Sequence, residues 1–278
     1  RYLADLRRKG VTGEALAAAK NQRTEDLAAV YATGKPHAIF QTARRLWDGI
    51  GIAADRAEAI RWFVRAATLG HVGARKAIVA AAETGNAAAQ SNLGVLFEKE
   101  GDLAQAVLWY RVAADRGDSH ARNNLGDLYR TGRGVARDPV KALHWFNRSA
   151  AQGNDVAIFH LGAMAEAGEG REKDIGEAAA WFRRAAEAGN SGAQYRLGRL
   201  YFLGRLGKRD LAKAVAFYRR SAASGFGPAQ NMLGWLHLHG KGVERDYVKA
   251  RILLGHAAAQ GDERACFNLG VLYRQGLG

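Results

Sequence analysis

The chain has 278 residues, enough for one elongated repeat array or for two globular domains. Its 41 Lys and Arg against 27 Asp and Glu give a net charge of +14, which favours acidic partners such as nucleic acid, an anionic membrane or an acidic protein face. Solubility alone is the competing interpretation, and it is favoured because basic residues occur along the whole chain. The single cysteine excludes an intrachain disulfide and a multi-cysteine zinc site. No stretch approaches the ~18 continuous apolar residues of a membrane span.

The N-terminal part carries the least regular pattern. The chain opens on Arg1, so we expect a fragment or a processed form, and the compartment, periplasmic or cytoplasmic, stays open. Residues 1–37 indicate degenerate helices with an end at Gly34-Lys35-Pro36. Residues 74–88 hold room for one helix only, a half repeat. Residues 38–73 fit a repeat frame through Gly49, Gly51, Asp55, Trp62 and Gly70.

Residues 89–120 return to the frame, and four 36-residue repeats follow at 121–156, 157–192, 193–228 and 229–264. Each opens with Ala, has Leu at position five and Gly at position six, and has further glycines at positions twelve and 33. Position eighteen is aspartate in all four: Asp138, Asp174, Asp210 and Asp246. The chain stops inside a last copy, 265–278. Self-similarity at this period predicts a stacked repeat array, residues 38–278.

Each repeat is predicted to form two antiparallel helices. The first ends at the Gly of position twelve, which can take the left-handed conformation that closes a helix. The second begins at the Asp of position eighteen, a good N-cap. At ~100° per residue, positions one, five, six and nine share one arc of the first helix, the predicted core. The Gly of position six should let the second helix approach closely, and the gap between repeats should be filled from position 25 by Trp145, Trp181 and Phe217.

Residues 121–153 carry the fullest copy of the motif: Ala121, Leu125, Gly126, Tyr129, Gly132, Gly134, Val135, Asp138, Lys141, Ala142, Trp145, Phe146, Ala150 and Gly153. This pattern resembles the Sel1-like repeat family over roughly residues 38–278. The resemblance implies an all-α fold, a right-handed superhelical solenoid of antiparallel helix pairs similar to tetratricopeptide arrays. It also implies adaptor roles in bacterial envelope, exopolysaccharide, secretion or virulence-linked processes. Departures from the pattern at Ala165, Leu206, His237 and Leu253 should loosen the packing locally.

The sequence lacks the motifs of common catalytic sites. It has no Gly-x-Ser-x-Gly and no phosphate loop of the Gly-x-x-x-x-Gly-Lys-Ser/Thr type. His237 and His239 lie two apart on a helix and face different ways, a poor metal pair, and His237 is expected in the core. Cys266 is expected to be an inert, buried thiol. We therefore predict no enzyme, no cofactor and no metal.

The family's stacking places the first helices on a concave wall. Positions three, seven, ten and eleven lie opposite the core arc, so they should line a groove, with Trp235 as its largest exposed residue. Exposed aromatic residues with arginines are frequent in protein-binding sites. Two alternatives stay open: the aromatics pack on one another, or further C-terminal sequence covers them. The predicted groove consists of Asn123, Phe159, Tyr195, Arg199, Phe202, Leu203, Asn231, Trp235, Leu238, Phe267, Val271 and Arg274.

A second predicted surface is basic. A row of arginines one repeat apart on the second helices consists of Arg148, Arg184 and Arg220. A solvent-exposed face is the simpler interpretation. The more specific one is nucleic-acid binding, which would need phosphate contacts along such a row. The loops between the two helices carry Arg133, Arg137, Arg171, Lys173, Arg205, Lys208, Arg209, Lys241 and Arg245.

The sequence thus predicts a non-enzymatic protein–protein interaction scaffold or adaptor of bacterial origin. Its partner would be another protein, which supplies an apolar and acidic peptide or helix to the groove. The alternative is a basic module that binds nucleic acid or an acidic membrane or polysaccharide surface.

Overall fold

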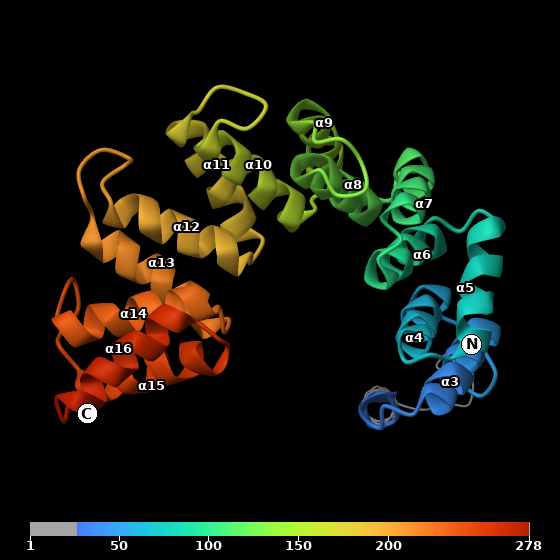
Figure 1. The fold of residues 1–278 in the computed structure, drawn as a ribbon, viewed down its shortest axis with the longest axis horizontal. Coiled ribbons are helices and arrows are strands. Elements are labelled where there is room, and N and C mark those ends of the chain that lie inside the picture. The colour runs from blue at the N-terminus through green and yellow to red at the C-terminus, as the bar shows by residue number, and fades with distance from the viewer. Residues whose placement is uncertain (1–26, 278) are drawn as a thin grey trace, which may run out of the picture. The chain divides into compact units, whose positions relative to one another are not determined.

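The computed structural model describes residues 27–277, and every regular element in that range is an α-helix (Figure 1). Most of the degenerate helices predicted at 1–37 lie outside the described residues, although residues 27–32 are helical. The helices that follow are α3 (Pro36–Asp48), α4 (Arg56–Thr68), α5 (Val72–Glu83), α6 (Ala87–Glu100), α7 (Leu103–Asp115), α8 (Ser119–Thr131), α9 (Pro139–Ala150), α10 (Asp155–Ala167), α11 (Ile175–Glu187), α12 (Ser191–Phe202), α13 (Leu211–Ala223), α14 (Gly227–His239), α15 (Tyr247–Ala259) and α16 (Glu263–Arg274).

The chain forms two compact units. The first unit, up to Arg137, contains α3 to α8, and the second unit, from Asp138, contains α9 to α16. Consecutive helices pair within each unit, as α6 with α7 and α12 with α13 do, and the second helix of one pair packs on the first helix of the next. Each pair therefore buries its remaining apolar face against its neighbour, which makes the fold an all-α solenoid of helix pairs.

Helix α5 has no second helix paired with it. The chain runs from α5 directly into α6, and α4 packs against both α5 and α6. The alternation of first and second helices is thus broken once within the first unit.

The helix ends follow from local sequence. Asp138, Asp174, Asp210 and Asp246 each accept, through the side chain, a hydrogen bond of 2.9 Å from the backbone N–H three residues later. This bond satisfies a donor that the first helical turn leaves unpaired, and it confirms the predicted N-caps. Gly168 and Gly240 close α10 and α14 with φ of 78° and 63°, the left-handed region that glycine tolerates.

The glycines of position six allow close helix contact, as predicted. A Cβ added to Gly162 would lie 2.7 Å from the Phe182 ring, and one added to Gly198 would lie 2.7 Å from the Tyr218 ring. Real Cβ atoms essentially never approach a neighbour so closely, so a side chain at either position would force the ring to move.

The same contacts show where the fully buried rings stand. Phe182 and Tyr218, at position 26, are fully buried and pack on the position-six glycine of their own repeat, whereas the residues predicted as fillers at position 25 are only half-buried. Residues at position 25 lie about 100° further round the second helix and are half-buried. Trp181, for example, donates its Nε1–H to Glu177 at the edge of the repeat, at 3.0 Å.

Candidate functional site

Ten of the twelve predicted groove residues lie on the first helices of the second unit, α10, α12, α14 and α16, and Leu203 is the C-cap of α12. The twelfth, Asn123, is half-buried on α8 of the first unit, where its Nδ2 donates to the side chain of Asn124 at 3.3 Å. Asn231 is half-buried too. Its side-chain amide donates to Asp262 at 3.2 Å and accepts from Asn268 at 3.1 Å. Both asparagines therefore serve local hydrogen bonds.

Two of the predicted groove aromatics pack against the second helices. The Phe159 ring lies 5.7 Å from that of Phe182, and the Tyr195 ring lies 5.7 Å from Tyr218 and 5.6 Å from Phe226, centroid to centroid. Both rings are half-buried. These partner rings lie outside the predicted groove, and only part of each groove ring is open to a partner. The alternative that groove aromatics pack on one another holds instead for Phe202 and Trp235.

Leu238 does not lie on a surface. Its side chain is 7 % exposed and packs with residues of α15 and α16, among them Leu254 and Leu272. The prediction that it lines the groove was wrong, because α16 closes over position ten of α14. Phe267 on α16 itself is 73 % exposed, and its neighbour Cys266 is exposed as well, so the prediction of a buried thiol was also wrong. No described helix follows α16 to cover either residue.

The most distinctive part of the predicted groove joins α12 to α14. The rings of Phe202 and Trp235 meet edge to face, with centroids 6.2 Å apart and planes at 83°. The Arg209 guanidinium lies 4.5 Å from the Phe202 centroid and the Lys241 ammonium 4.9 Å from the Trp235 centroid. Such cations are attracted by the ring faces. Trp235 also contacts the His239 ring, at 4.6 Å, and we call these five residues the aromatic–cation cluster.

Residues beside this cluster remain open. Arg199 is exposed on α12, and Leu203 at its end is 49 % exposed. At the C-terminal end Arg274 is exposed and Val271 half-buried. Trp235 is half-buried and not the freely exposed residue that was predicted. The surface therefore offers the edges of half-buried rings between exposed cationic side chains.

Positive charge is concentrated around the cluster. Residues 191–262 contain 12 Lys and Arg against 4 Asp and Glu, a net charge of +8, whereas residues 119–190 contain 10 against 9, a net charge of +1. Basic residues thus occur along the whole chain, but their excess over acidic residues is concentrated in residues 191–262. The pKa of His239 is lowered by burial and also by the positive charges of Lys241 and Arg245. The electrostatic potential around the cluster is thus positive, because the basic residues there outnumber the acidic ones.

The predicted row of basic loop residues divides into two parts. Arg133 pairs with Glu98 at 3.0 Å, and Arg171 pairs with Glu177. By contrast, five basic residues around the cluster are exposed and form no ion pair with a described residue: Arg205, Lys208, Arg209, Lys241 and Arg245.

The separate row of arginines on the second helices contacts aromatic rings. Arg148 and Arg184 lie over the rings of Trp145 and Trp181.

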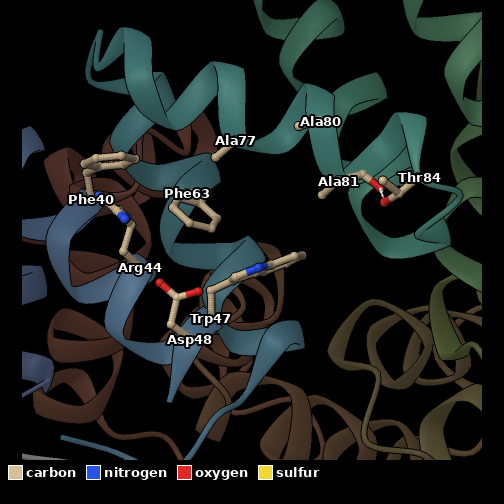
Figure 2. A pocket seen from close by; sticks show the side chains of 9 residues that line it. All are labelled: Phe40, Arg44, Trp47, Asp48, Phe63, Ala77, Ala80, Ala81 and Thr84. Atoms are coloured by element: carbon tan, nitrogen blue, oxygen red, sulfur yellow. Dashed lines mark hydrogen bonds between the residues drawn. The ribbon is translucent and has the colours of Figure 1, made fainter. Parts of the chain in front are cut away.

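A separate pocket of about 370 Å³ opens in the first unit between α3, α4 and α5 (Figure 2). Helix α4 contributes Phe63, and α5 contributes Ala77, Ala80, Ala81 and Thr84. Helix α3 contributes Phe40, Arg44, Trp47 and Asp48, which stand at positions three, seven, ten and eleven of the repeat 38–73. These are the positions predicted to line a groove in later repeats. The signal was present in the sequence, but the register rule was not extended to this repeat.

The described residues give little basis for a metal or membrane site. Among residues 27–277 no group of three or more His, Cys, Asp and Glu could hold a metal ion. In the same range no helix is long and apolar enough to cross a bilayer. His237 is 7 % exposed, and its Nδ1 lies 3.1 Å from the Glu244 carbonyl oxygen, which confirms the predicted core position.

The repeat pattern matches a known family model, described as the Sel1 repeat, at residues 36–71, 87–118, 119–154, 155–190, 191–226, 227–262 and 263–278. The chain belongs to the Sel1 repeat family. Each of the seven Sel1 matches begins two residues before the corresponding repeat read from the sequence. The matches pass over residues 72–86, where α5 stands without a partner helix.

Solved Sel1 structures share this fold. A Sel1 repeat protein from Oxalobacter formigenes is 29 % identical, with a TM-score of 0.66 over 91 % of this chain and 81 % of that one. A protective antigen of uropathogenic Escherichia coli that displays an SLR fold is 33 % identical, with a TM-score of 0.63 over 91 % of this chain and 52 % of that one. The chain thus spans about half the length of the antigen.

One curated relative is similar over a short segment. The DAP3-binding cell death enhancer 1 of Rattus norvegicus is 45 % identical over 65 residues, which are 23 % of this chain and 13 % of the rat protein. Sel1 repeat proteins generally mediate protein–protein interaction, and they form a scaffold family that is generally non-catalytic.

Proposed function

We propose that this Sel1 protein is a non-enzymatic, bacterial scaffold that binds an apolar and acidic peptide or helix of another protein. The site is the face formed by α10, α12, α14 and α16, centred on the aromatic–cation cluster. The observation that carries the proposal is the edge-to-face pair of Phe202 and Trp235 beneath cations that have no acidic partner among the described residues. Both solved Sel1 structures cited above come from bacteria, which supports the proposed origin.

The chemistry of the cluster sets the chemistry of the ligand. The exposed parts of Phe202, Trp235 and Leu203 supply apolar contact area. Because the rings are half-buried and held by neighbours, they lose little conformational entropy when a ligand binds. Arg209, Lys241 and Arg199 can hold carboxylates by charge-assisted hydrogen bonds, which are stronger than neutral ones. A segment that alternates acidic and aromatic or aliphatic residues satisfies both requirements.

A random copolymer of glutamate and tyrosine is a suitable probe of this proposal. The double variant Arg209→Gln, Lys241→Gln should weaken its binding at least about tenfold, since hydrogen bonds to charged groups contribute about 1.5–3 kcal/mol. The matched control is Arg183→Gln, Arg219→Gln, which removes the same charge from exposed positions on α11 and α13. Fluorescence anisotropy at constant salt measures the affinity of both double variants for the copolymer. Equal weakening by the two pairs would contradict a localised site.

The second candidate function is a basic module for nucleic acid or for an acidic membrane or polysaccharide surface. The net charge of +8 over residues 191–262 favours it. Oligothymidylate, phosphatidylserine vesicles and heparin represent the three ligands. Binding through phosphates falls steeply as salt rises because counterions are released. Tight, strongly salt-dependent binding of any of these, combined with weak binding of the copolymer, would favour this function over the scaffold.

A further inference from the structure

The pocket of the first unit has a filled counterpart in the second unit. Between α12 and α14, Phe202 at position ten contacts Trp235 at position seven of the next first helix. Between α3 and α5, position ten is Trp47, but position seven of the half repeat 74–88 is Ala80. The ring that Trp235 supplies in the second unit is therefore missing in the first, which explains why about 370 Å³ stays empty there.

The walls of the pocket suit an aromatic ring. Figure 2 shows the rings of Trp47 and Phe63 on one side and the small side chains of Ala80 and Ala81 on the other. Phe63 is only 4 % exposed and belongs to the core, so that wall is fixed. The volume lies within the roughly 300–1,000 Å³ of ligand pockets, near the lower end. It is a place for a single large side chain.

We propose that this pocket binds one aromatic side chain, of the size of tryptophan or phenylalanine, from a segment of a partner protein. The ring lies edge to face against Trp47, in the arrangement that Trp235 adopts against Phe202. Aromatic pairs favour this geometry because the positive edge of one ring meets the negative face of the other. An aliphatic anchor of similar size gains the burial but not this contact.

The rim of the pocket adds a charge pattern. Arg44 and Asp48 lie one helical turn apart on α3, and both are exposed. Neither forms an ion pair with a described residue. Arg61 and Glu58 on α4, by contrast, do pair with each other. The bound segment therefore carries an acidic residue toward Arg44 and a basic residue toward Asp48, on either side of its aromatic anchor. This site lies outside the surface proposed above and does not depend on it.

The experiment uses the indole groups of the protein as reporters. The chain has six tryptophans, and ¹⁵N labelling of their side chains gives a small set of indole N–H resonances, with that of Trp47 assigned from Trp47→Phe. Titration with N-acetyl-tryptophan amide should shift the Trp47 resonance to saturation. N-acetyl-leucine amide should bind at least about twofold more weakly, because it lacks the ring contact. Equal binding of the two probes, or no shift of Trp47, would overturn the proposal.

A filling variant tests the location. Ala80 is exposed. In the variant Ala80→Trp, the protein's own side chain provides the ring that Trp235 provides in the second unit. This variant should lose the response to N-acetyl-tryptophan amide and keep or raise the melting temperature. The control Ala104→Trp, at an exposed position on α7, should respond as the wild type does. If Ala80→Trp fails to fold, Ala80→Leu serves for the same measurement. A retained response in the filled pocket would overturn the proposal.

A further variant separates the two sites. Trp235→Leu removes the ring of the aromatic–cation cluster in the second unit and should leave the Trp47 response unchanged. Loss of copolymer binding in Trp235→Leu, with the Trp47 response intact, shows two independent sites. Loss of the Trp47 response in Trp235→Leu would place the probe in the second unit and contradict the pocket.

Discussion

Position six of the repeat holds glycine for a reason that differs between copies. A Cβ at Gly198 would lie 2.7 Å from the Tyr218 ring, whereas a Cβ at Gly270, the same position on α16, has no atom within 4 Å. Gly198→Ala should therefore destabilise the protein by about 1–3 kcal/mol through overpacking. Gly270→Ala should stabilise it by up to about 1 kcal/mol, because alanine is the better helix former. Urea unfolding of both variants checks this, and shifts of the same sign would contradict it.

Leu238 and Leu203 were both predicted to line the groove, and the structure separates them. Leu238 is 7 % exposed within the cluster formed by α14, α15 and α16, and Leu203 is 49 % exposed. Leu238→Ala should cost about 2–5 kcal/mol of unfolding free energy, because it leaves a cavity. Leu203→Ala should change stability by less than about 0.5 kcal/mol but weaken copolymer binding. Thermal unfolding and anisotropy on both variants test this, and the reverse pattern would place Leu238 on the surface after all.

At the residue scale, helical periodicity predicted which side of a first helix faces outward but not what lies over it. The rule is correct for Arg199 and Leu203, and it also describes Phe40 and Trp47 of the pocket. It fails for Leu238 because a third helix, α16, covers that position. Periodicity within one helix carries no information on such a neighbour. The same limit explains why the full burial of position 26 was not predicted.

Three second helices, α9, α13 and α15, begin at the aspartates Asp138, Asp210 and Asp246, whose pKa is lowered in the folded protein. Hydrogen bonds from Lys141 hold the pKa of Asp138 below its ordinary value of 3.8, and those from Lys213 do the same for Asp210. A carboxyl whose pKa is lowered in the folded state stabilises that state above the unfolded pKa, and this contribution is lost as the pH falls through the folded pKa. The melting temperature should therefore fall as the pH drops below about 4.

A neutral cap tests the origin of this acid dependence. Serine caps helices nearly as well as aspartate but carries no charge. The triple variant Asp138→Ser, Asp210→Ser, Asp246→Ser should keep most of the stability at pH 7 and show a flatter decline toward pH 2. Melting temperatures across this range measure the effect. An unchanged acid profile would assign the decline to other carboxylates.

At the element scale, glycine and aspartate made the helix ends predictable, since both residues act through their own backbone geometry or through hydrogen bonds within a single turn. The unpaired helix in residues 74–88 was predictable from the missing space in the sequence. The pocket beside it was not, because it depends on the pair formed by Trp47 and Ala80 across two helices. Comparison with Phe202 and Trp235 in the structure was needed to see that a ring is absent.

The whole molecule follows from the repeat. Stacked pairs bury one another's apolar faces, so a pattern present in several copies specifies an all-α solenoid without any knowledge of individual contacts. Circular dichroism should accordingly show helix and no substantial strand. The concentration of charge was also available from the sequence, at +8 for residues 191–262 against +1 for residues 119–190. It was overlooked because the charge was judged over the whole chain and not repeat by repeat.

The central claim is that rings and cations of the second unit act together on an acidic, aromatic partner segment. The most direct measurement is the affinity of the wild-type protein for the glutamate–tyrosine copolymer and for polyglutamate as salt is raised. The account predicts tighter binding of the copolymer and a shallower fall of its affinity with salt, because the tyrosines contact Phe202 and Trp235 and ring contacts are not screened. Equal affinities that fall equally steeply with salt would show that charge alone binds the ligand and would contradict the account.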